Sequence, residues 1–163
     1  MAEGAGGMTY IRMMTDILSK KKDHLERILE YTKSQEEILK REVFAEDEFT
    51  ALVEKKEGLI KKIEEFDDGF QSVYNRMAEE LAENKEKYKE QILELQGLIT
   101  KVTDLGVSLT ALEQKNRSNM ELSLRDKKSG IKQFKVSKQT ADKYYKNMIG
   151  MQTGASYFMD QKK

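Results

Sequence analysis

The feature that constrains the fold most is a seven-residue apolar repeat that runs along most of the chain without a single proline to interrupt it. Apolar positions that alternate three and four residues apart lie on one face of an α-helix. The first set predicts a helix over about residues 9–44. Its stripe consists of Ile11, Met14, Leu18, Leu25, Ile28, Thr32 and Leu39.

A second helix is predicted over about residues 47–82, after a break at the sequence AED. Asp47 is the expected N-cap, because its carboxylate can accept hydrogen bonds from the first free backbone amides. Lys56 is the one polar residue in this stripe, and Asp67, Asp68 and Gly69 are a place where the helix could be interrupted. The stripe consists of Phe49, Leu52, Leu59, Ile63, Phe66, Phe70, Val73 and Met77.

A third helix is predicted to start near residue 86 and to reach residue 121 within the bundle. Its stripe weakens past Asn116 and resumes further along the chain, so the helix could continue to about residue 149. The stripe within the bundle consists of Tyr88, Ile92, Leu95, Ile99, Val102, Leu109 and Leu112, and the continuation consists of Leu124, Ile131, Phe134, Ala141, Tyr145 and Met148.

These lengths predict an all-α fold, an elongated antiparallel three-helix bundle or coiled coil. At 1.5 Å per residue the first two helices span roughly 50–55 Å, whereas a helix over 86–149 would reach about 95 Å. The third helix is therefore expected to overhang the bundle from about residue 122. Residues 1–8, which are rich in glycine, are expected to form a flexible leader.

The charge changes sign at the same place. Residues 1–121 carry 19 Lys+Arg and 26 Asp+Glu, a net charge of −7, whereas residues 122–163 carry 10 and 3, a net charge of +7. Such an asymmetry indicates two segments with different functions in one chain. We therefore expect an acidic helical bundle over 9–121 and a basic amphipathic extension over 122–163 that binds a partner.

The residue inventory argues against an enzyme. The chain has no cysteine and a single histidine, His24, which we expect on a solvated helix face. Pairs such as Ser19 with Lys22 lack the companion motifs of serine enzymes, and no phosphate-binding glycine motif occurs. No catalytic residue, cofactor or metal site is predicted. No apolar run is long enough to span a membrane, and the cytoplasm is the expected compartment.

The best candidates for partner binding lie in the basic extension. An anchor stripe is expected from Ile131, Phe134, Tyr144, Tyr145, Met148 and Ile149, and a second set from Tyr157, Phe158 and Met159. Aromatic side chains contribute strongly to interfaces, and methionine adapts to irregular surfaces. Two alternatives remain open: the extension packs in a homodimer or back on the bundle, as in a structural coiled coil, or its lysines and tyrosines bind single-stranded nucleic acid. The acidic bundle argues against the latter.

Two segments resemble FlgN-like flagellar export chaperones. QEEILKREVFAEDEFTALVEKKEGLIKKIEEFDDGF, residues 35–70, resembles the end of the first helix, the acidic turn and the second helix of that family. KYKEQILELQGLITKVTDL, residues 87–105, resembles the start of the long third helix. The ending Phe158-Met159-Asp160 is similar to that of clostridial members.

This resemblance implies an all-helical cytoplasmic chaperone of hook-filament junction proteins, also called hook-associated proteins. Such a chaperone keeps its clients unassembled and presents them to the flagellar type III export apparatus. The resemblance further implies that the carboxy-terminal region, residues 122–163 here, captures the client.

Overall fold

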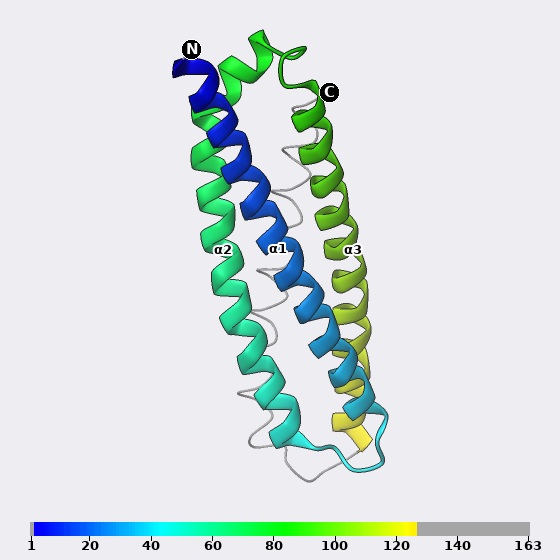
Figure 1. Ribbon diagram of the computed structural model, residues 1–163. Helices are drawn as coiled ribbons and strands as arrows, with labels where there is room; N and C mark the ends of the chain where they lie inside the picture. The colour runs from blue at the N-terminus through cyan, green and yellow to red at the C-terminus, as the bar shows by residue number, and fades with distance from the viewer. Residues whose placement is uncertain (1, 127–163) are drawn as a thin grey trace.

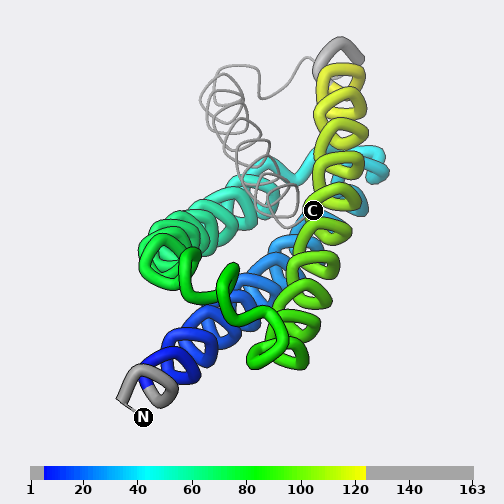
Figure 2. Tube along the Cα trace, turned by 90° about the horizontal axis from the view of Figure 1, so that it is seen from above, coloured from blue at the N-terminus to red at the C-terminus, as the bar shows by residue number. Residues whose placement is uncertain are grey.

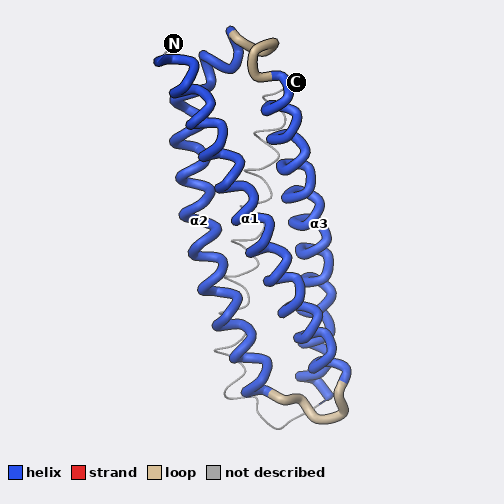
Figure 3. Tube along the Cα trace, in the orientation of Figure 1, coloured by secondary structure: helices blue, strands red, loops and turns tan. Residues whose placement is uncertain are grey.

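A computed structural model describes residues 2–126 of the chain, and these residues form three long α-helices and no strand. Helix α1 spans Ala2–Lys40, α2 spans Glu46–Glu83 and α3 spans Lys89–Asp126. Short connections reverse the chain at each end (Figures 1 and 3). The prediction of an all-α helical bundle is confirmed.

Helix α1 is the centre of this bundle. It packs antiparallel against α2 and parallel to α3 along their lengths (Figure 1). Within residues 2–126, no Cα atom of α2 comes within 8 Å of a Cα atom of α3. The view along the bundle shows α2 and α3 diverging on either side of α1 (Figure 2). The three helices therefore form two seams that share α1, without a third seam.

The heptad stripes meet in two apolar clusters. One lies toward the α1–α2 connection and includes Ile28 of α1, Ile63 of α2 and Leu109 of α3, each fully buried. The other lies toward the α2–α3 connection and includes Met14, Met77 and Leu95. Because burying such a side chain contributes about 1.5–3 kcal/mol, these stripes supply the main driving force for pairing the helices.

The helix boundaries differ from the sequence prediction at both ends of α1. The helix begins at Ala2, so residues 2–8, expected to form a flexible leader, are its first turns. It ends at Lys40 instead of residue 44, because the following residues form the turn. There the rings of Phe44 and Phe49 pack with centroids 5.5 Å apart, and Arg41 Nη1 lies 2.8 Å from Glu48 Oε2.

The predicted N-cap of α2 is wrong. Ala45 precedes the helix and provides no side-chain cap, whereas Asp47 lies inside the first turn. There Glu46, Asp47 and Glu48 stabilise α2 by a different effect, because carboxylates at a helix N-terminus interact favourably with the helix dipole.

The suspected interruption of the second helix is helical, because α2 continues through Asp67, Asp68 and Gly69. Helix α3 likewise continues through Gly106. Over the described residues α3 has 38 residues, the same number as α2. The predicted continuation to residue 149 and its overhang lie outside the described residues.

Candidate partner-binding face and buried polar layer

All nine residues predicted to bind a partner lie outside the described residues. They are Ile131, Phe134, Tyr144, Tyr145, Met148, Ile149, Tyr157, Phe158 and Met159. The structure therefore does not test them. It does show two features of the bundle that bear on partner binding: a polar layer buried between the helices, and the sides of α2 and α3 that α1 leaves unpaired.

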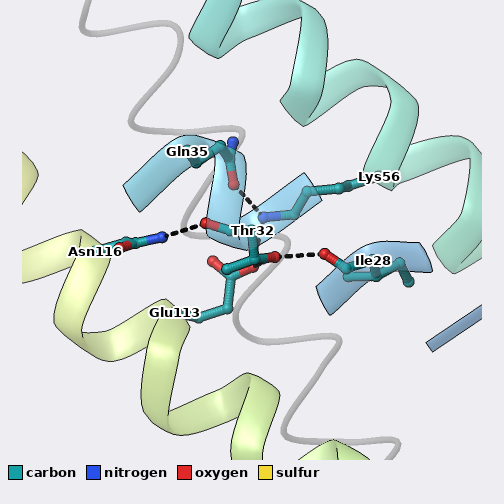
Figure 4. A network of polar contacts seen from close by, with 6 residues as sticks. All are labelled: Ile28, Thr32, Gln35, Lys56, Glu113 and Asn116. Carbon is teal, nitrogen blue, oxygen red and sulfur yellow. Dashed lines mark hydrogen bonds and ion pairs between the residues drawn. The ribbon is translucent and has the colours of Figure 1, made fainter. Parts of the chain in front are cut away.

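The polar layer lies within the cluster nearer the α1–α2 connection (Figure 4). Lys56 of α2 reaches across the bundle, where its ammonium donates to Gln35 Oε1 of α1 and forms an ion pair with Glu113 Oε1 of α3. The side chains of Lys56 and Glu113 are each 2% exposed. Since α2 and α3 do not pack directly, this long side chain connects them.

Thr32 and Asn116 complete the layer. The Thr32 hydroxyl lies 2.7 Å from the Ile28 carbonyl oxygen and 2.9 Å from Glu113 Oε1, and its single proton can be donated to one of them at a time. Asn116 Nδ2 donates to the Thr32 carbonyl oxygen at 3.0 Å. This bond ties α3 to α1 beside the ion pair (Figure 4).

Burial dominates the electrostatics of the layer. Desolvation lowers the pKa of Lys56, and the neighbouring Glu113 carboxylate opposes this by attraction and by its hydrogen bond. A charge in such a place is tolerated because it is paired and hydrogen-bonded, and removing one partner of a buried pair typically costs 3–5 kcal/mol. The layer therefore fixes which residues of the three helices lie side by side.

A second ion pair crosses the α1–α2 seam nearer the middle of the helices. Lys21 Nζ lies 2.6 Å from Asp67 Oδ1. The Lys21 side chain is 7% exposed and that of Asp67 is 35% exposed. Burial raises the pKa of Asp67, and the Lys21 ammonium partly offsets the rise. Because water reaches the carboxylate, this pair is weaker than the Lys56–Glu113 pair.

Sequence reasoning identified Lys56 as a polar residue in an apolar stripe but missed its partners. The heptad pattern could have indicated these partners, because Gln35, Glu113 and Asn116 are polar residues at stripe positions of their helices. All three are buried. On α3 the buried stripe runs through Leu109, Glu113, Asn116 and Met120, whereas Leu112, which was assigned to it, is half-buried.

His24 also differs from the expectation of a solvated face. It is half-buried in the α1–α2 seam, where its ring packs edge-on against Phe66 with centroids 5.1 Å apart. Its Nδ1 lies 2.9 Å from the Lys20 carbonyl oxygen. Residues 2–126 contain no group of three or more side chains able to hold a metal ion. None of their helices is long and apolar enough to cross a membrane.

Half-buried residues flank the buried stripes of α2 and α3. On α2, Glu57 lies about 80° around the helix from Asp67, which pairs with Lys21 of α1, at 100° per residue. On α3, Thr110 lies about 60° from Glu113, which accepts a hydrogen bond from Thr32 of α1. We call this surface the α2–α3 face and define it by half-buried residues of the two helices: Thr50 and Glu57 of α2, and Gln96, Thr103 and Thr110 of α3.

The described part of the chain is an all-α helical bundle with long helix faces, and a partner helix can pack along faces of this kind. A comparison with protein families identifies the family of this chain. The model of the FlgN protein family matches residues 8–147, and the chain belongs to that family. FlgN proteins are flagellar export chaperones, so the predicted family is confirmed. No curated protein and no solved structure gave a match.

Proposed function

We propose that this chain is a cytoplasmic chaperone of hook-filament junction proteins. It binds terminal segments of these hook-associated proteins, keeps them from assembling early and delivers them to the flagellar export apparatus. The observation that carries this proposal is the family match over residues 8–147, since members of this family are flagellar export chaperones. The assignment to a clostridial branch of the family stays a prediction.

The client-binding region we propose is the basic extension, residues 122–163. The family match continues through residue 147 and so includes Ile131, Phe134, Tyr144 and Tyr145. An apolar stripe among many lysines fits an amphipathic helix that lays its apolar face against a helix of the client. Tyr157 to Met159 lie beyond the match and are the weaker candidates.

The test is binding of a purified hook-associated protein to the full chain by calorimetry. Replacing Phe134 and Tyr145 by Asp should weaken binding by at least about 30-fold, because the loss of even one aromatic anchor of an interface costs about 2 kcal/mol or more. The matched control is Leu93→Asp, which places the same charge at an apolar residue of α3 that is 58% exposed.

Unchanged affinity in the Phe134→Asp, Tyr145→Asp double variant would overturn the proposed binding region. Light scattering on the same samples measures the oligomeric state and so tests the alternative of a self-associating coiled coil. If the native chain is a stable dimer and the double variant is a monomer, the stripe is a dimer interface instead.

A further inference from the structure

The α2–α3 face lies between two helices that do not pack on one another. In a four-helix bundle each helix packs against two neighbours, whereas α2 and α3 each pack against α1 alone within the described part of the chain. The view along the bundle shows them as two arms that diverge from α1 (Figure 2). Glu57 and Thr110, which flank the stripes that pack on α1, are half-buried.

Charge identifies the occupant. Residues 1–126 carry 20 Lys+Arg and 27 Asp+Glu, a net charge of −7, and residues 127–163 carry 9 and 2, a net charge of +7. The row of α2 that borders the face is acidic, with Glu46, Glu57 and Glu64. Nine lysines in the carboxy-terminal segment complement the charge of this row.

Length and starting point fit as well. As a helix, residues 127–163 would be about 55 Å long, and the 38 residues of α2 span about 57 Å. The segment starts from Asp126, at the end of the bundle where α1 connects to α2 (Figure 1). Ser129-Gly130 follows at once and is a turn signal, so the segment can run back along the face.

We propose that residues 127–163 dock intramolecularly on the α2–α3 face, antiparallel to α3, as the fourth element of the bundle. The apolar stripe of Ile131, Phe134, Tyr145 and Met148 packs toward α1, and the lysines lie along the acidic row of α2. This rests on the proposed function in one respect: the docked stripe is the one that holds the client. Docking and client binding therefore exclude one another.

The native chain has no cysteine, so pairs of cysteines can test the docking directly in the full chain. Tyr145→Cys is combined with Thr110→Cys on the face or, as matched control, with Ala111→Cys. Ala111 is adjacent and exposed, and it lies about 100° further around α3. Ala141→Cys and Met148→Cys replace Tyr145→Cys in parallel, to allow for a register shifted by one helical turn.

With a short bis-maleimide, we expect an intramolecular product that forms about tenfold faster with Thr110→Cys than with Ala111→Cys, because docking raises the effective concentration on one side of α3. Equal rates, or no intramolecular product at any of the three positions, would overturn the docking. Cross-linked dimers without cross-linked monomers would overturn it too, since the face would then hold a second copy.

This readout involves no client, so the two proposals fail separately. If cross-linking is unselective while Phe134→Asp with Tyr145→Asp still abolishes client binding, docking is wrong and the proposed function stands. If cross-linking is selective but the two substitutions leave the affinity for the client unchanged, the proposed binding region is wrong. When both hold, the cross-linked monomer should bind the client at least about tenfold more weakly than the uncross-linked variant.

Discussion

The buried Lys56–Glu113 pair gives the sharpest prediction on stability. In Glu113→Leu the Lys56 ammonium loses its counter-ion while remaining 2% exposed, with Gln35 as a neutral partner. Removing one partner of such a pair typically costs 3–5 kcal/mol. With a urea dependence of about 2–3 kcal/mol per molar, the unfolding midpoint followed by circular dichroism should fall by about 1–2 M.

Two further variants make this result specific. Lys56→Met combined with Glu113→Leu removes both charges, so the double variant should be as stable as the native chain or more stable by about 1–4 kcal/mol. Glu65→Leu is the matched control, because Glu65 and its partner Lys62 have side chains 69% and 62% exposed. Removing an exposed pair should change stability by less than about 1 kcal/mol.

The pH dependence of Glu113→Leu follows from the lowered pKa of Lys56. A lysine whose pKa is lower in the folded than in the unfolded state destabilises the fold fully below its folded pKa. That penalty disappears as pH rises toward the unfolded pKa. Without Glu113 the folded pKa falls further, so the loss of stability should be larger at pH 7 than at pH 10. A loss no larger than that of Glu65→Leu, or one independent of pH, would refute the account of a desolvated, paired ammonium.

Two further predictions concern close packing and the second ion pair. A Cβ atom at Gly7 would collide with Tyr88 Oη, and that hydroxyl is held by Glu80 at 2.8 Å. At Gly6 nothing lies within 4 Å. Gly7→Ala should therefore lower the thermal midpoint through overpacking of about 1–3 kcal/mol, whereas Gly6→Ala should leave it unchanged or raise it; equal effects would contradict the contact. The raised pKa of Asp67 means that this group favours the folded state below its unfolded pKa and loses that contribution as pH rises through its folded pKa. Lys21→Met should raise the Asp67 pKa further, so urea midpoints should show a larger loss of stability at pH 7 than at pH 4, and a loss independent of pH would refute this linkage.

Local pattern predicted the helices because their causes are local. The heptad stripes placed Met14, Ile28, Ile63 and Leu109 in the core, where the structure has them. The helix boundaries were predicted less accurately. Helix α1 ends where Phe44 packs on Phe49 in the turn, and the heptad pattern does not predict this tertiary contact. The predicted capping role of Asp47 depended on the boundary of α2 as well. The helix begins at Glu46, so Asp47 lies inside the first turn and not at the N-cap.

The sequence by itself determined an all-α chain with apolar stripes, a break close to residue 45 and an acidic part followed by a basic one, because periodicity and charge are properties of the chain order. The tertiary structure decided which helices pair. Nothing in a single stripe specifies that α1 takes both neighbours while α2 and α3 stay apart. It also decided that Lys56, Gln35 and Glu113 meet, because an ammonium buried in one helix needs acceptors that the other two supply only once all three are packed.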